Sequence, residues 1–150
     1  MKDVIIVPSA ASQDRQNRNI GERVALYLMQ ILDDDMLLGV AHGRSLYYTG
    51  RFLQNSRHIR VDTLQLQGAV SSLATMNESG GLISLFASKL NGKGFVLNAP
   101  LMVKSSLVKN YLINSEMMSP VLKKYQELNV ALFEIEPPAF YANQRTGIGR

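Results

Sequence analysis

The alternation of short apolar runs with segments of helical periodicity is the feature that most constrains how this chain can fold. Strands are predicted over residues 3–8, 36–41, 60–67, 95–97 and 130–133. Between them, apolar residues recur at helical spacing in segments that begin near Asn19, Leu46, Gly80, Leu107 and Pro120. Strands that alternate with helices pair in parallel through right-handed crossovers. The sequence therefore predicts an α/β fold, a three-layer sandwich with a mainly parallel sheet.

Three local features extend this expectation near the start of the chain. The continuous apolar run Val4–Val7 is typical of a strand buried on both faces. Asn19 and Glu22 have the spacing of a helix-capping pair, so the first helix is expected to begin there, after a polar stretch over 9–18. Asp33–Asp35 lie where that helix should end. Carboxylates at this end oppose the helix dipole, which favours a solvated turn over a metal site.

Composition narrows the range of functions without naming one. The 150 residues suit a single domain. Cysteine is absent, which excludes thiolate nucleophiles and thiolate metal sites, and we expect neither metal nor cofactor. The net charge is +4, but the 16 Lys and Arg residues are scattered rather than gathered as on a DNA-reading face. No apolar run approaches the roughly 20 residues of a membrane span, and the first is too short for a signal peptide. A cytoplasmic protein without membrane contact is expected.

Ligands in an open α/β sheet bind beyond the carboxyl ends of the strands, which selects the loops 41–45, 67–72 and 98–101. The first loop is the best candidate for an anion site. Gly43 lets the backbone approach a ligand, and Ser45 lies at an expected helix N-terminus, where free amides favour phosphate. The Ser45 hydroxyl and the Arg44 guanidinium could add charge-assisted hydrogen bonds. Ser45 could equally be a simple helix cap.

The other candidate residues carry weaker signals. Gly68 with the hydroxyls of Ser71 and Ser72 could form an amide nest or an ordinary turn. Pro100 could shape a pocket wall or merely redirect the chain. His42 could contact a ligand, whereas the second histidine, at position 58, is expected on the surface. No Walker loop, nucleophile elbow or dinucleotide fingerprint occurs.

Four segments, taken together and in order, carry a family resemblance. They are Ile20–Leu28, Leu38–Leu46, Val61–Val70 and Gly94–Val103. The second segment includes Gly43-Arg44-Ser45, and the fourth includes Asn98-Ala99-Pro100-Leu101. In sequence order, these segments resemble the effector-binding domain of the SorC family of sugar-operon transcription regulators. The resemblance extends over about residues 2–133.

This resemblance implies a Rossmann-like sheet similar to that of ribose-5-phosphate isomerase and glucosamine-6-phosphate deaminase. It also implies a phosphorylated sugar as an effector that is bound without turnover. By position, the ligand-binding residues would be Gly43, Arg44 and Ser45 around the phosphate, Gly68 and Ala69 along the sugar, and Ala99 and Pro100 as a wall. Residues 1–150 would be one effector domain, incomplete at its C-terminal end, in a homo-oligomer. Operator DNA would be a partner only through a helix-turn-helix that this chain lacks.

The sequence departs from the family pattern in three places. Ser45 replaces the usual threonine but keeps the hydroxyl group. Ala69 replaces the second glycine of its loop, so a left-handed backbone there would be strained. Glu134 and Glu136 flank Ile135 where Gly-Ile-Gly is usual, which brings two carboxylates close to the expected anion pocket.

Three other interpretations stay open at this point. An isomerase or deaminase of the same fold would need an acid and a base, but the candidate loops offer no carboxylate before Glu134. A flavodoxin-like or receiver module is less suited, because a receiver needs acidic residues after the first strand, where Pro8–Ala10 stand. A remnant that binds nothing is the third, and the departures from the family pattern keep it open.

Overall fold

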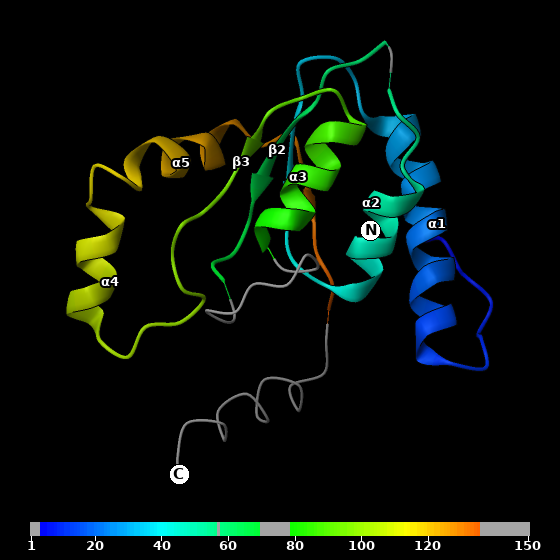
Figure 1. Cartoon of the computed structure of the whole chain (residues 1–150), viewed down its shortest axis with the longest axis horizontal. Coiled ribbons are helices and arrows are strands. Elements are labelled where there is room, and N and C mark those ends of the chain that lie inside the picture. The colour runs from blue at the N-terminus through cyan, green and yellow to red at the C-terminus, as the bar shows by residue number, and fades with distance from the viewer. Residues whose placement is uncertain (1–3, 57, 70–78, 136–150) are drawn as a thin grey trace.

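The structure, a computed structural model, describes residues 4–56, 58–69 and 79–135 (Figure 1). Its helices are α1 (Gln13–Ile31), α2 (Arg44–Phe52), α3 (Ser79–Lys89), α4 (Ser106–Ile113) and α5 (Ser119–Lys124), the last continued by the 3-10 turn η1 (Tyr125–Glu127). Its strands are β1 (Leu37–Val40), β2 (Asp62–Gln65), β3 (Gly94–Phe95) and β4 (Val130–Leu132). These four strands form one parallel sheet in the order β3-β2-β1-β4. Among the described residues, no helix is long and apolar enough to cross a membrane.

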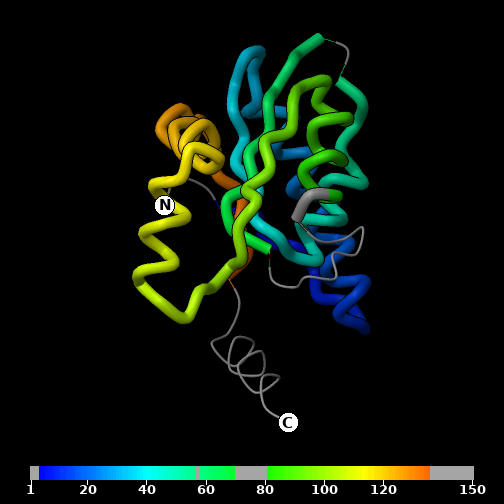
Figure 2. The backbone as a smooth tube through the Cα atoms, turned by 60° about the vertical axis from the view of Figure 1, so that its left-hand side comes forward, coloured from blue at the N-terminus to red at the C-terminus, as the bar shows by residue number. Residues whose placement is uncertain are grey.

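The sheet lies between two layers of helix, as Figures 1 and 2 show from different directions. Helices α1, α2 and α3 form the layer on one face, and α5 lies across the other face. The α5 layer is held by Lys124, whose Nζ lies 4.6 Å from the ring centroid of Phe95 in β3. It is also held by the Tyr125 hydroxyl, which donates a 2.7 Å hydrogen bond to the backbone carbonyl of Gln65. The expected three-layer α/β sandwich is confirmed.

Strand β1 is the centre of the fold because it pairs with β2 on one side and with β4 on the other. All four of its residues are buried, as expected for a strand covered on both faces. Its alternating side chains enter different layers: Leu38 and Val40 join the core beneath the three helices, whereas Gly39 lies against Leu66 and Leu128 on the opposite side. The pairing also aligns the ends of the strands, since Val40 is opposite both Gln65 and Leu132.

The main hydrophobic core fills the space between the sheet and the three-helix layer. Its members come from α1, β1, α2 and α3 and include Ala25, Leu28, Leu38, Val40, Leu46, Leu82, Ile83 and Phe86. Full burial of a side chain such as leucine or phenylalanine stabilises a fold by about 1.5–3 kcal/mol relative to exposure. This core therefore orients α2, and with it the loop that joins β1 to α2.

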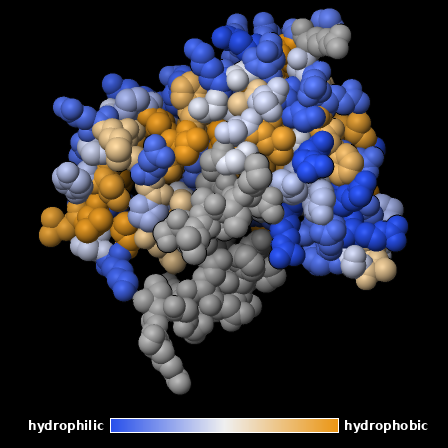
Figure 3. Space-filling model, viewed as in Figure 1, coloured by the Kyte–Doolittle hydropathy of each residue, from blue (hydrophilic) through white to orange (hydrophobic). Residues whose placement is uncertain are grey.

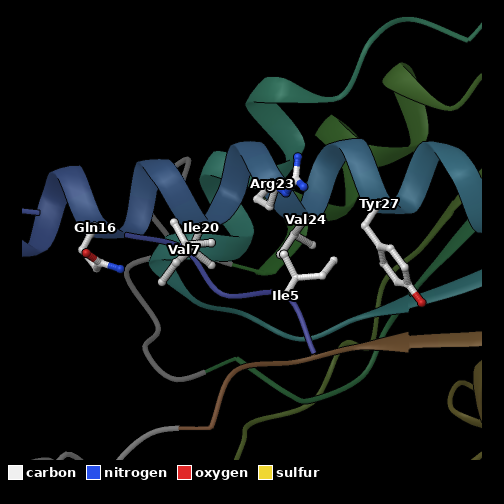
Figure 4. A pocket seen from close by; sticks show the side chains of 7 residues that line it. All are labelled: Ile5, Val7, Gln16, Ile20, Arg23, Val24 and Tyr27. Carbon is white, nitrogen blue, oxygen red and sulfur yellow. The ribbon is translucent and has the colours of Figure 1, made fainter. Parts of the chain in front are cut away.

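The strand predicted over 3–8 is wrong for the residues that the structure describes, 4–8. These residues belong to no strand, and Val4 and Ile6 are 65% and 87% exposed. Ile5 and Val7 instead face α1, where they line a hollow with Ile20 and Val24 (Figure 4). A short apolar run does not distinguish a sheet strand from a segment that packs on one helix. In the sheet, the two neighbours of β1 are β2 and β4, and residues 4–8 pair with neither side of it.

The first helix begins earlier than the Asn19–Glu22 pair predicts. Ser12 is its N-cap, and the Ser12 hydroxyl oxygen accepts a 3.3 Å hydrogen bond from the Arg15 amide. The polar stretch expected over 9–18 is therefore helical from Gln13 onward. A serine cap works through one local hydrogen bond, and several polar residues in this stretch could have supplied it.

The expected turn at Asp33–Asp35 is confirmed. Asp34 accepts a 2.7 Å hydrogen bond from the Arg60 amide, and the exposed Asp35 carboxylate forms an ion pair with the Arg60 side chain. The other predicted helices and strands are present with shifted ends, and the strands are shorter than predicted. The carboxylates thus tie the end of α1 to the start of β2.

Gly21 sets the distance between α1 and α2, which suggests a test of the packing. A methyl group added at Gly21 would lie 2.5 Å from the Tyr48 Cβ and 2.7 Å from the Thr49 backbone nitrogen. Gly21→Ala should therefore lower the free energy of unfolding by about 1–3 kcal/mol in urea denaturation, despite the better helix propensity of alanine. The exposed neighbour provides the control, since Glu22→Ala should change stability by no more than about 0.5 kcal/mol. A Gly21→Ala protein as stable as wild type would contradict the close packing.

Candidate functional site

The loop after β1 places the N-terminus of α2 at the carboxyl edge of the sheet. Gly43 is the N-cap of α2, with extended backbone and no side chain to cap the helix. Arg44 and Ser45 are therefore the first two residues of the helix itself. The interpretation of Ser45 as a simple cap is wrong, because Gly43 holds the cap position and the Ser45 hydroxyl group donates to the Glu134 side chain. The Arg44 side chain is exposed, whereas Ser45 is buried.

A carboxylate from the far end of the chain lies against this helix start. The Ser45 backbone N–H donates a 2.7 Å hydrogen bond to Glu134 Oε1, and the Ser45 hydroxyl donates to the same oxygen. A Cβ atom at position 43 would overlap the Glu134 carboxyl group, so with a larger residue there this side chain would have to move. The carboxylate thus satisfies an amide that the helix itself leaves without a partner.

The second and third candidate loops join each other through their backbones. The Ala69 amide donates a 2.8 Å hydrogen bond to the Ala99 carbonyl, and the Leu101 amide donates one of 2.8 Å to the Ala69 carbonyl. Ala69 and Pro100 form an isolated parallel bridge. The strain considered for a left-handed Ala69 is absent, because Asp35 and Asn91 are the non-glycine residues with positive φ in the described part of the chain.

Gly68 allows this close approach of the two loops. A methyl group added at Gly68 would lie 2.5 Å from the carbonyl oxygens of both Ala99 and Pro100. These are backbone atoms, which cannot rotate away as a side chain can. The glycine is required here by the space between two chain segments.

Two glutamines connect the loops, and sequence reasoning missed both. Gln67 Nε2 lies 2.5 Å from His42 Nδ1, so a side-chain contact joins the first loop to the second. Gln65 is 2% exposed; its Nε2 donates a 2.6 Å hydrogen bond to the Gln67 carbonyl, and its Oε1 accepts one of 3.1 Å from the Leu97 amide. A glutamine inside an otherwise buried strand was the signal that could have revealed it, since buried polar groups need partners.

Tyr125 supports this edge of the sheet from the α5 layer. Its hydroxyl donates to the Gln65 carbonyl at 2.7 Å. Burial raises the pKa of the Tyr125 hydroxyl above its usual value, so the group keeps its proton and remains a donor at neutral pH. The end of β2 is therefore held by two sets of hydrogen bonds: one from the Tyr125 hydroxyl to the Gln65 carbonyl, and those that the Gln65 side chain makes with the neighbouring backbone.

The structure brings the predicted site residues into two connected groups. Gly43, Arg44 and Ser45 form the start of α2. In the other group, Ala69 pairs through its backbone with Ala99 and Pro100, and Gly68 lies close to both of them. Ser71, Ser72 and Glu136 lie outside the described residues. His58 is exposed, as expected. In the described ranges no group of three or more His, Asp or Glu side chains could hold a metal ion.

A protein-family model described as "Putative sugar-binding domain" matches residues 1–138 of the chain. The chain belongs to this sugar-binding domain family. The match includes every residue predicted to contact ligand, and it extends to Glu134. One curated relative of this sugar-binding domain is the "Deoxyribonucleoside regulator" of Bacillus subtilis (strain 168), with 23% identity over 111 residues. That alignment covers 74% of the chain and 36% of the relative.

Solved structures share the fold of this sugar-binding domain. The probable sor operon regulator of Shigella flexneri superposes with a TM-score of 0.85 at 23% identity, over 93% of this chain and 58% of that one. The full-length sorbitol operon regulator SorC of Klebsiella pneumoniae gives a TM-score of 0.79 at 19% identity, over 87% of this chain and 42% of that one. The chain thus spans about half the length of these proteins. The expected fold class and the resemblance to SorC-type domains are confirmed.

The backbone contact at Gly68 yields a test of the site. Gly68→Ala should separate the two loops and lower the stability of the sugar-binding domain by about 1–3 kcal/mol. The Leu101 amide, which donates to Ala69, should then exchange with solvent faster in hydrogen-exchange measurements. Ala69→Gly adds no atom to this contact and is the matched control. Unchanged protection of the Leu101 amide in Gly68→Ala would contradict the proposed role of the glycine.

Proposed function

We propose that this domain binds a phosphorylated sugar without turnover, as the effector domain of a transcription regulator. The phosphate would bind at the N-terminus of α2, against Gly43, Arg44 and Ser45. The sugar would lie along Gly68 and Ala69, and Ala99 and Pro100 would form the adjoining wall. Membership of the sugar-binding domain family supports the sugar.

The observation that carries the phosphate proposal is the carboxylate at the start of α2. An anionic group already accepts hydrogen bonds from the Ser45 amide and hydroxyl, as a phosphate oxygen would. The α2 N-terminus contributes the positive end of the helix dipole, and the exposed Arg44 guanidinium is adjacent in sequence. Arginine suits phosphate because its planar group can donate two parallel hydrogen bonds. The described side chains around α2 thus offer what an anionic ligand group needs.

The names of the relatives support a role in regulation rather than catalysis. One relative is named a deoxyribonucleoside regulator and another a sorbitol operon regulator. As a proposal, residues 1–150 would form one effector domain of such a regulator in the cytoplasm, and operator DNA would be bound through a separate helix-turn-helix.

A homo-oligomer is part of this proposal, and an apolar surface over α4 supports it. Leu107 and Tyr111 of this helix are 79% and 76% exposed, and Met117 beyond it is 63% exposed. Figure 3 shows hydrophobic residues gathered on the left of the molecule, where α4 lies in Figure 1. Apolar surfaces of this kind often mark contacts between proteins.

A thermal-shift screen tests the proposed effector class. Phosphorylated sugars should raise the melting temperature, whereas their unphosphorylated counterparts should not. A ligand at about 100 times its dissociation constant stabilises a fold by roughly 2.7 kcal/mol, which is readily seen. The double variant Arg44→Ala with Ser45→Ala should lose the shift, because it removes both the guanidinium and the hydroxyl group.

The control variant removes one positive charge, as Arg44→Ala does, but at a position away from the α2 N-terminus. Arg15→Ala, on the exposed surface of α1, should keep the full ligand-induced shift. Equal shifts from phosphorylated and unphosphorylated sugars would contradict the phosphate subsite. Release of product from a phosphosugar in a coupled assay would instead favour an isomerase or deaminase. No shift from any sugar would favour a remnant.

A further inference from the structure

The Glu134 carboxylate occupies the position at which an anionic ligand would meet α2. It accepts from both donors that Ser45 offers, the amide at 2.7 Å and the hydroxyl. It also packs directly on Gly43, the N-cap that has no side chain of its own. The start of α2 is therefore already bound to an anion that belongs to the chain itself.

The register of the sheet brings Glu134 to this place. β4 pairs with β1 so that Leu132 is opposite Val40, and the Ala41 amide donates a 2.9 Å hydrogen bond to the Leu132 carbonyl. Both chain segments then leave the sheet at the same edge, one toward α2 and the other toward Glu134. The contact spans 89 positions in sequence, so it forms only when the parallel pairing is complete.

One N–H group cannot donate at full strength to two anions, and two anions that both lie within hydrogen-bond reach of Ser45 would repel each other. The carboxylate and a ligand phosphate would therefore exclude each other from Ser45. We propose that Glu134 is an internal competitor that sets the affinity and specificity of the site, because a phosphorylated ligand binds only after displacing the Glu134 carboxylate from the α2 N-terminus. This inference rests on the proposed function, which assigns the phosphate to that helix start.

A purely structural cap makes a different prediction. A carboxylate at a helix N-terminus stabilises the helix, so loss of Glu134 should lower the melting temperature in either case. If capping were its whole role, removal of Glu134 would leave phosphate affinity unchanged or reduce it. If Glu134 competes with phosphate, the same substitution destabilises the protein and yet strengthens phosphate binding. Stability and affinity then move in opposite directions.

The test follows inorganic phosphate by the amide resonance of Ser45 in two-dimensional NMR. Wild type is compared with Glu134→Ala, which vacates the helix start, and with Glu134→Gln, which removes the charge and keeps the shape. Glu116→Gln, an exposed position between α4 and α5, is the matched control. Glu134→Ala should bind phosphate about 10-fold more tightly or better, the factor expected when one charge-assisted hydrogen bond need not be broken. Glu134→Gln should lie between Glu134→Ala and wild type, and Glu116→Gln should match wild type.

The possible results separate this inference from the proposed function. If phosphate shifts the Ser45 resonance with equal affinity in wild type and both Glu134 variants, the phosphate subsite stands and the competitor role is overturned. If phosphate never reaches Ser45, even in Glu134→Ala, the subsite and the competitor are both overturned. Glu134→Gln keeps the test decisive if Glu134→Ala does not fold, since its amide oxygen can still accept from Ser45.

Discussion

The parallel pairing of β1 with two neighbours is the constraint on which the rest of this structure depends. β1 is a buried four-residue strand that carries the core on one face and Gly39 on the other. Parallel strands of one sheet end at the same edge, so the loops after β1, β2 and β4 emerge together. The ligand-binding residues predicted from the sequence lie at that edge. Strand direction and register therefore decide where the candidate site lies, and the side chains of the loops decide its chemistry.

The main chemical feature of that edge is the N-terminus of α2. A helix start presents amides without internal partners and the positive end of a dipole, and such groups attract anions. In this domain an intramolecular carboxylate meets that demand through Ser45, while the exposed Arg44 remains at the surface. The chain belongs to a sugar-binding domain family, and the hydrogen bonds at the start of α2 are the basis for proposing a phosphate there. In our proposals, the Glu134 carboxylate and the phosphate of a ligand would use the same position at the start of α2.

Periodicity predicted most elements because their apolar patterns reflect burial that tertiary packing preserves. The runs around Leu38, Leu64 and Val130 became strands, and the segments around Leu46 and Phe86 became helices. The failures have physical reasons. Val4–Pro8 has a strand-like composition, but a run of this length packs equally well against a helix, and Ile5 and Val7 do so on α1. The true start of α1 depended on one hydroxyl, at Ser12, among several polar candidates.

For the candidate site, the sequence alone predicted the loops and the residue types, because glycine, serine and arginine after a strand are typical of anion binding. Their contact with a ligand stays a prediction. It could also indicate that Glu134 departs from its family pattern. Only the tertiary structure decided that Glu134 reaches Ser45, that Gly68 is needed for the approach of Ala99, and that Gln67 contacts His42. These contacts join residues between 25 and 89 positions apart. Local pattern carries no information about such distances, since strand order and register set them.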